Sequence, residues 1–237
     1  MSGHSKWSTI KRQKGVADAK RGAIFTKIGN QIAIAARGGT DPNLNSSLAL
    51  AIEKAKSANM PMTNIERAIA RVSDKSAAVL EEVTYEAYGP GGIGIIVETA
   101  TDNRNRTFPE VRTALTKSGG TVAEPGSVAF QFTRKGVIHV SDTGENALLT
   151  VLDAGADDAI EEDGEIVVYT DAKSLASVRK QLITDGLTVT DAGLEYVPNS
   201  SIEISDSATA EKVIKILDAL DDLDDVTAVH SNADLVD

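Results

Sequence analysis

Apolar residues in the first third of the chain recur three or four residues apart, which is the spacing of a helix with one buried face. The first such pattern ends at Gly38-Gly39, and its apolar members are Ile24, Phe25, Ile28, Ile32, Ala35 and Ala36. A second helix is expected from Asp41-Pro42, where an N-cap residue precedes proline at the first helical position. A third is expected from the capping box Thr63–Glu66. Three helices with short connections predict a helical domain over residues 1–76.

After residue 76 the apolar period changes to that of strands alternating with short helices. Strands are expected at residues 79–88, 93–101, 128–133, 137–140, 158–162, 165–170, 187–197, 201–204 and 226–230. Helices are expected from a second capping box at Thr107, and at residues 145–154, 173–184 and 207–220. Between two of the strands, Asp163-Gly164 predicts a two-residue hairpin turn, because this pair tolerates the positive φ angles that the turn requires.

Strands paired by hairpins and separated by helices predict sandwiches with helices on one face of an antiparallel sheet. Residues 77–133 hold too few elements for a complete ferredoxin-like unit, so we expect residues 198–237 to return and complete it. Residues 134–197 would then form an inserted domain. The expected fold class is α+β, with an N-terminal three-helix domain followed by two ferredoxin-like α/β sandwich domains, one inserted in the other.

Charge divides the chain at about the same place as the apolar period. Residues 1–75 carry 13 Lys and Arg against 5 Asp and Glu, a net charge of +8. Residues 76–237 carry 11 against 30, a net charge of −19. An acidic body would repel a polyanion everywhere except at the basic end, so the asymmetry predicts an oriented encounter with nucleic acid. The alternative is that the acidic residues serve only solubility.

The basic head, residues 2–40, holds eight Lys and Arg against one acid, Asp18. Cations beside a single aromatic residue are typical of a surface that binds phosphate. The alternatives are a solvated helix face for the cations and, for Trp7, an anchor to the helical core instead of a stacking contact with a base or sugar. The predicted nucleic-acid-binding residues of the head are Lys6, Trp7, Lys11, Arg12, Lys14, Lys20, Arg21 and Lys27.

The polar segment Thr101–Thr107 lies between a predicted strand and a predicted helix and contains two arginines. Arg104 and Arg106 could make bidentate contacts with phosphate or carboxylate groups, and both are candidate nucleic-acid-binding residues. The equally weighted alternative is a hydrogen-bonded loop, because Asp and Asn are ordinary turn residues.

Other candidate chemistry finds little support. The chain has no cysteine, which excludes disulfides, thiolate metal sites and a cysteine nucleophile. The three histidines lie in different segments, and the glycines of Gly89–Gly94 precede a strand, whereas a phosphate loop precedes a helix. The run Asp221–Asp225 lacks the glycine and final glutamate of a calcium loop and predicts a solvated helix end. We therefore expect no enzyme activity, no metal and no cofactor.

Membrane association is not expected either. The apolar stretch Ile32–Ala36 is too short to span a bilayer, and the N-terminus has no apolar signal segment. These features predict a cytoplasmic protein with no membrane partner, and they leave the oligomeric state open.

Several strings of the chain resemble the YebC/PmpR family. They span residues 2–140 in order and are Gly3-His-Ser-Lys-Trp7, Lys20-Arg-Gly22, Phe25-Thr-Lys27, Asn59-Met-Pro61, Asn64-Ile-Glu-Arg-Ala-Ile69, Tyr88-Gly-Pro-Gly-Gly92, Thr101-Asp-Asn-Arg-Asn-Arg-Thr107, Glu110-Val-Arg112, Gly119-Gly120, Gly126-Ser-Val128 and Arg134-Lys-Gly136. The acidic remainder is similar to the family in length and pattern, with weaker motifs.

The resemblance implies three domains and a non-enzymatic, cytoplasmic, DNA-binding regulator of transcription. It also implies an alternative, since relatives have been linked to translation: a ribosome-associated factor that binds ribosomal RNA and relieves stalling at proline-rich stretches. The partner would be duplex DNA in one case and the ribosome in the other. Matching motif positions in this chain are Lys6, Trp7, Lys11, Lys14, Lys20, Arg21, Lys27, Arg104 and Arg106. Where relatives usually carry basic residues, this chain has Asn30, Ala49 and Met62, and each is expected to remove a potential phosphate contact.

Overall fold

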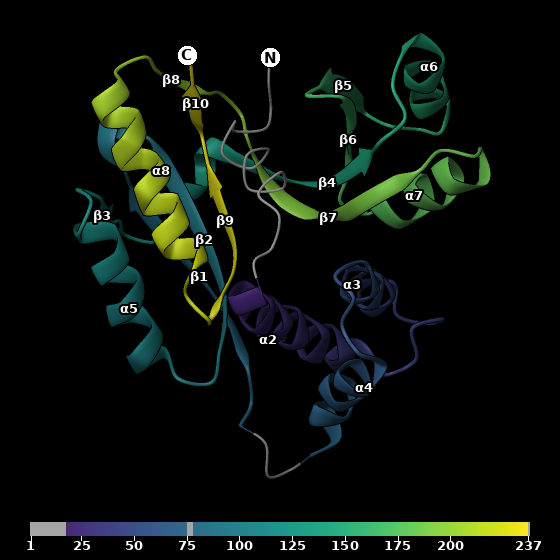
Figure 1. The fold of residues 1–237 in the computed structure, drawn as a ribbon, viewed down its shortest axis with the longest axis horizontal. Helices are drawn as coiled ribbons and strands as arrows, with labels where there is room; N and C mark the ends of the chain where they lie inside the picture. The colour runs from purple at the N-terminus through teal and green to yellow at the C-terminus, as the bar shows by residue number, and fades with distance from the viewer. Residues whose placement is uncertain (1–17, 75–77, 237) are drawn as a thin grey trace. The chain divides into compact units, whose positions relative to one another are not determined.

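The computed structural model describes residues 18–74 and 78–236, with side chains from Gly22 onward (Figure 1). The chain divides into two compact units. One is Phe132–Asn199, and the other contains the remaining described residues on both sides of it. Each unit is considered by itself below.

The larger unit begins with three helices, α2 (Asp18–Ala35), α3 (Ser46–Ser57) and α4 (Met62–Ala70). A 3-10 turn, Ala36–Gly38, extends α2 toward the glycines that end the predicted pattern. The three helices share a hydrophobic core, and its most buried members are Ile28, Ile32, Leu48, Ala55 and Ile65. The N-terminal helical region predicted from the apolar period is therefore present.

In this helical region, two of the predicted helix starts are wrong. Asn45, not Asp41, caps α3: its side-chain oxygen accepts the Leu48 N–H at 3.1 Å, and its amide donates to the carbonyls of Ala35 and Gly39. These donations tie the cap to the end of α2, which a local motif does not reveal. Helix α4 starts after Pro61, with no side-chain hydrogen bond at its cap, so the Thr63 capping box does not form.

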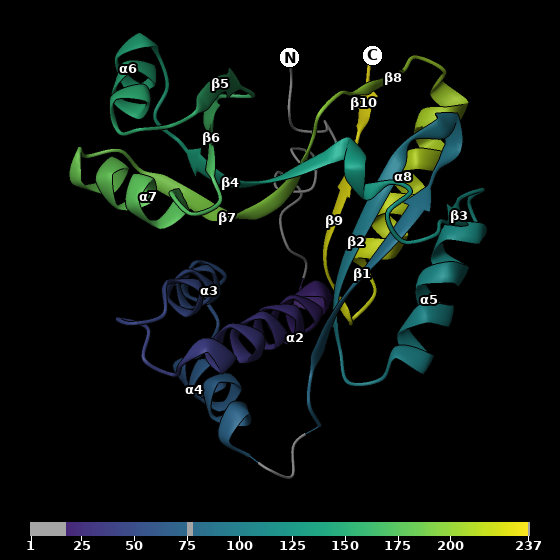
Figure 2. The ribbon, with the colours of Figure 1, turned by 180° about the vertical axis from the view of Figure 1, so that it is seen from behind.

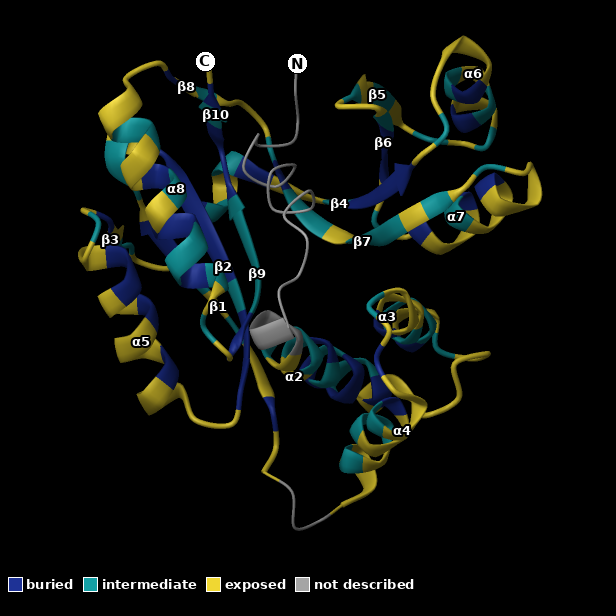
Figure 3. Cartoon of the chain, in the orientation of Figure 1, coloured by how far each residue is buried: buried dark blue, intermediate teal, exposed yellow. Residues whose placement is uncertain are grey.

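The same unit contains a four-stranded antiparallel sheet. Its strand order is β3 (Thr121–Val122), β1 (Glu81–Tyr88), β2 (Gly94–Thr101) and β9 (Val226–Ser231). Helices α5 (Arg104–Thr116) and α8 (Ser207–Asp221) share one core with this sheet (Figures 1 and 2), and its fully buried members include Ile95, Val97, Leu115, Ile216 and Leu217. Strand β2 is buried along nearly its whole length (Figure 3).

The C-terminal segment completes this sheet, because β9 pairs with β2, with Ile96 opposite His230. Two short strands, β8 (Ile202–Ile204) and β10 (Ala233–Leu235), form a separate parallel pair, and the sequence pattern did not predict β10. The bounds of a separate helical domain ending at residue 76 stay a prediction.

The unit Phe132–Asn199 has the βαββαβ order of a ferredoxin-like fold. Its elements are β4 (Phe132–Val140), α6 (Glu145–Asp153), β5 (Asp158–Glu162), β6 (Glu165–Asp171), α7 (Leu175–Thr184) and β7 (Val189–Pro198). The strands are antiparallel in the order β5-β6-β4-β7. Asp163 and Gly164 have φ angles of 51° and 82°, as the predicted hairpin turn requires.

The prediction of two separate strands at residues 128–133 and 137–140 is wrong, because β4 is a single strand from Phe132 to Val140. Residues Ala129–Gln131 form a 3-10 turn, and a single strand then runs through the polar residues around Gly136. A Cβ atom at Gly136 would lie 2.9 Å from the Leu175 Cβ, so this glycine permits the close approach of α7 rather than ending a strand.

Candidate nucleic-acid interface

The strongest part of the predicted interface lies outside the described residues. Lys6, Trp7, Lys11, Arg12 and Lys14 all precede Asp18, so their binding role stays a prediction. Lys20 and Arg21 belong to the first turn of α2, and only their backbone is described.

The described part of the helical region is close to neutral. Between residues 22 and 74 the sequence has six Lys and Arg against four Asp and Glu. Residues 1–21, in contrast, have six against one. The positive charge of the first 75 residues is therefore concentrated at and before the N-terminal end of α2. A surface that attracts a polyanion would be centred there and not on α3 or α4.

Lys27 is the first predicted site residue whose side chain is described, and it makes internal contacts. Only 14 % of its side chain is exposed. Its ammonium group donates to the main-chain carbonyl of Asp221 at the end of α8 and lies 3.7 Å from the Asp221 Oδ1. One turn later, the Gln31 Nε2 donates to the Thr227 carbonyl of β9 at 3.4 Å. The side of α2 that carries Lys27 therefore packs against the α/β part of the same unit.

Arg104 and Arg106 lie at the start of α5, and each is paired with a carboxylate from another segment of the chain. The helix begins at Arg104, and Asn103 is its N-cap, since the Asn103 side chain accepts the Arg106 N–H at 3.2 Å. The predicted start at Thr107 is therefore wrong. The Arg104 Nε lies 2.6 Å from the Glu81 Oε2 in an exposed pair. The Arg106 Nη2 lies 2.8 Å from the Asp225 Oδ2 and 3.2 Å from the Asp102 Oδ1.

Asp225 is the centre of this arrangement. Its carboxylate also accepts the hydroxyls of Thr107 at 2.6 Å and Thr101 at 3.1 Å. Burial alone would raise the pKa of Asp225, but the hydrogen bonds from Thr107, Arg106 and Thr101 outweigh burial and hold the pKa below its ordinary value. These contacts are those of the hydrogen-bonded-loop alternative, and a phosphate-binding role for Arg104 and Arg106 remains a prediction.

The run Asp221–Asp225 is only in part the solvated helix end that its composition predicts, since Asp222 and Asp224 are exposed but the other two aspartates are not. Asp225 is 9 % exposed and Asp221 contacts Lys27. Sequence reasoning missed Asp225, and no local signal identifies it, because its partners Thr101, Arg106 and Thr107 lie far away in the chain.

The three departures from the family pattern differ in position. Asn30 is 9 % exposed, and its side-chain oxygen accepts from the Arg71 Nη1 at 3.4 Å. It therefore packs between α2 and the 3-10 turn Arg71–Ser73 that follows α4, and the expected loss of a phosphate contact at this position stays a prediction. Ala49 is partly buried, whereas Met62 is exposed.

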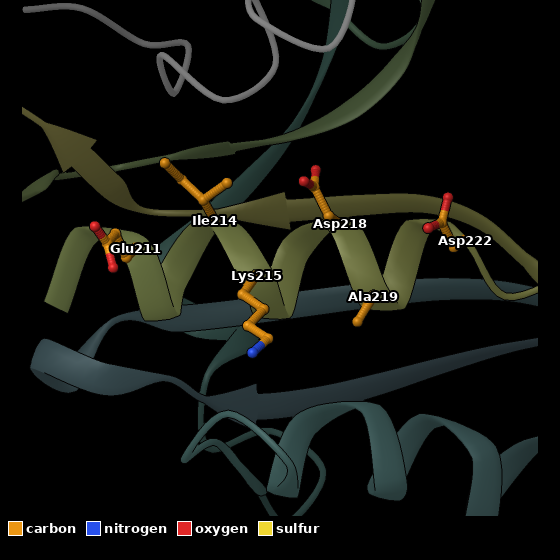
Figure 4. A pocket seen from close by; sticks show the side chains of 6 residues that line it. All are labelled: Glu211, Ile214, Lys215, Asp218, Ala219 and Asp222. Atoms are coloured by element: carbon orange, nitrogen blue, oxygen red, sulfur yellow. The ribbon is translucent and has the colours of Figure 1, made fainter. Parts of the chain in front are cut away.

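A hollow of about 420 Å³ lies along α8 (Figure 4). Its lining residues are Glu211, Ile214, Lys215, Asp218, Ala219 and Asp222. Three carboxylates against one lysine disfavour a phosphate ligand. Within residues 18–74 and 78–236, no group of three or more His, Asp or Glu side chains is placed to hold a metal ion. Over the same residues, none of the helices has the length and apolar character needed to cross a membrane.

Comparison with known proteins identifies the family. Residues 5–75 match the family described as the TACO1/YebC protein N-terminal domain, and residues 80–233 match the TACO1/YebC second and third domain. A probable transcriptional regulatory protein of Moorella thermoacetica is 48% identical over 242 residues, which cover 99% of this chain and 96% of the relative. One from Herpetosiphon aurantiacus is 49% identical over 243 residues, covering 100% and 96%.

A solved structure agrees with this result. The crystal structure of a conserved hypothetical protein from Aquifex aeolicus is similar to this chain with a TM-score of 0.88 and 41% sequence identity. The match covers 93% of both chains, so it includes both compact units. Together with the matches over residues 5–75 and 80–233, this shows that the chain belongs to the TACO1/YebC family.

Proposed function

We propose that this protein is a non-enzymatic, DNA-binding regulator of transcription that contacts its target through the basic head. The observation that carries the proposal is the charge distribution: six cations against one acid ahead of Gly22, and a net charge of −19 after residue 75. The name "probable transcriptional regulatory protein" of close relatives supports the same role.

The proposed contacts are mostly with the phosphate backbone. Phosphate contacts give affinity and orientation, whereas sequence is read at base edges. If about five cations of the head each neutralise a phosphate, log K should fall with log[salt] with a slope of roughly −4 to −5. The acidic body contributes by repulsion, because it disfavours every orientation in which the head does not face the polyanion.

The test is salt-dependent binding to duplex DNA by a variant with Lys6, Lys11 and Lys14 all changed to Ala. Losing three phosphate contacts should reduce the magnitude of the slope by about 3. The matched control changes Lys117, Lys173 and Lys180 to Ala, which removes the same charge from exposed positions of the body. The proposal fails if the two triple variants bind equally or if the unmodified protein has a slope near zero.

A second candidate function is a ribosome-associated translation factor, and Trp7 is the residue that favours it. Recognition of folded or single-stranded RNA uses aromatic stacking on bases, which a duplex backbone does not require. Crosslinking in living cells, followed by sequencing of the bound nucleic acid, separates the two. Reads on promoter DNA that disappear in the Lys6/Lys11/Lys14 variant support the regulator. Reads on ribosomal RNA that disappear in that variant support the translation factor.

A further inference from the structure

Helix α2 is packed along two neighbouring stripes. One stripe, which includes Ile28 and Ile32, belongs to the core of the three helices. The other holds Lys27, Gln31 and Ile34, spaced i, i+4 and i+7, so that they share one side of the helix. All three are partly buried. A polar stripe that is buried must have partners for its polar atoms, since an unpaired buried donor is costly.

Those partners are main-chain carbonyls of the α/β part of the same unit. Lys27 donates to the carbonyl of Asp221, and Gln31 donates to that of Thr227. Beyond the end of α2, the Arg37 Nη1 donates to the Leu80 carbonyl at 2.9 Å, just before β1. Three donors of the helical region thus bind backbone atoms at the end of α8, on β9 and ahead of β1.

The Lys27 contact also satisfies the end of another helix. The last carbonyls of an α-helix have no partner within the helix, and its C-terminal end attracts a cation. The Lys27 ammonium group occupies this position at the end of α8, next to the carboxylate of Asp221. A phosphate group bound to Lys27 would compete with the Asp221 carboxylate and would have to reach an ammonium group on a side chain that is 14 % exposed.

We infer that Lys27 is a positioning residue: it fixes α2 on the end of α8 and does not bind nucleic acid. Fixing this helix also fixes the position of its N-terminal end relative to the α/β part of the same unit. The inference rests on the proposed function only where it concerns nucleic acid. The contact between α2 and α8 is a property of the protein alone.

The first experiment therefore uses the full-length protein without nucleic acid. Amide hydrogen exchange is measured in Lys27→Met and in Lys56→Met, which makes the same change at an exposed position of α3. Exchange in residues 22–35 should become roughly tenfold faster in Lys27→Met only, the change expected for one lost charged hydrogen bond. Lys27→Arg should restore protection, because the guanidinium group can donate to the same carbonyl. Equal exchange in the two Met variants would overturn the contact.

The second experiment measures the salt dependence of nucleic-acid binding in the same variants. If Lys27 is a positioning residue, Lys27→Met and Lys56→Met should have the same slope of log K against log[salt]. A phosphate-binding Lys27 predicts that the magnitude falls by about 0.9 in Lys27→Met only, and that result would overturn the positioning role. If the unmodified protein shows no binding, the proposed function fails, while the exchange result still decides the contact between α2 and α8.

Discussion

At the scale of single residues, two buried carboxylates organise segments that are distant in the chain. Asp225 joins Arg106, Thr107 and Thr101 at the start of α5. Glu86, 9 % exposed on β1, accepts backbone N–H groups of the loop around Ser127, with distances of 2.6 to 2.8 Å. Burial opposes the ionisation of Glu86, but these three backbone hydrogen bonds outweigh it and hold its pKa below the ordinary value. Both carboxylates are therefore ionised in the folded protein at neutral pH, and in this form they accept the hydrogen bonds that stabilise the fold.

Asp225→Asn should lower the free energy of unfolding by roughly 2 kcal/mol at pH 7, because a neutral amide replaces an acceptor of charge-assisted hydrogen bonds. The pKa of Asp225 is lower in the folded protein than in the unfolded chain, so its ionised carboxylate stabilises the fold fully above the unfolded aspartate pKa of about 3.9. This stabilisation is lost as the pH falls through the pKa of the folded protein. The difference between the two proteins should therefore shrink below about pH 4.

Urea unfolding at pH 7 and at pH 3 measures this difference. The control is Asp224→Asn, which changes the exposed neighbouring residue and should have almost no effect at either pH. A difference between Asp225→Asn and the unmodified protein that stays constant across the pH range would contradict the role of the ionised carboxylate.

At the scale of elements, helix starts depend on contacts that a short motif does not contain. Both Asp41-Pro42 and Asn45-Ser46 satisfy the usual preferences for a helix start. Asp41 instead accepts the Asn43 N–H at 2.9 Å within a turn, and Leu44 remains 88 % exposed. The helix begins where Leu48 reaches the core, because burial of an apolar face outweighs local cap preference.

Asn45→Ala should destabilise the protein by about 1–2 kcal/mol, because it removes the cap of α3 and two donations to the end of α2. Asp41→Ala removes only contacts within an exposed turn, so its effect should stay within about 0.5 kcal/mol. Thermal unfolding followed by circular dichroism compares the two variants. Equal losses of stability would mean that the helix begins at Asp41 after all.

At the scale of the whole molecule, the unit Phe132–Asn199 is joined to the rest of the chain by two adjacent strands. Phe132 pairs with Pro198 where β4 begins and β7 ends, and the Thr133 hydroxyl donates to the Asn199 side chain at 2.6 Å. A segment whose two ends lie together, and whose four strands form a complete sheet, has the features of a domain that can fold alone.

We expect a fragment of residues 132–199 to fold by itself. Its thermal unfolding should be one cooperative transition, with dispersed amide signals in its NMR spectrum below that transition. The matched partner is the chain in which a short glycine-serine link replaces these residues, and it should keep its own sheet. A fragment that stays unfolded would show that this unit depends on the rest of the chain.

The kind and approximate extent of most elements follow from the amino-acid sequence, as do the hairpin turn at Asp163-Gly164 and the concentration of cations ahead of Gly22. These features are local: apolar period, turn chemistry and charge can be read within a few turns of the chain. The candidate residues and a nucleic-acid partner came from the charge pattern, and the family resemblance added the two alternatives for that partner, duplex DNA and the ribosome.

The contacts of the candidate side chains, in contrast, depend on the folded arrangement of distant segments. Lys27 and Arg106 are candidate phosphate-binding residues in the sequence, yet they pair with Asp221 and Asp225, which lie more than a hundred residues away. Asn45 shows the same dependence over a shorter range, because its cap is favoured by contacts with the end of α2. Hydrogen bonds and ion pairs depend on distances of a few ångströms between atoms, and for Lys27 and Arg106 those distances exist only after the C-terminal segment has returned to the sheet.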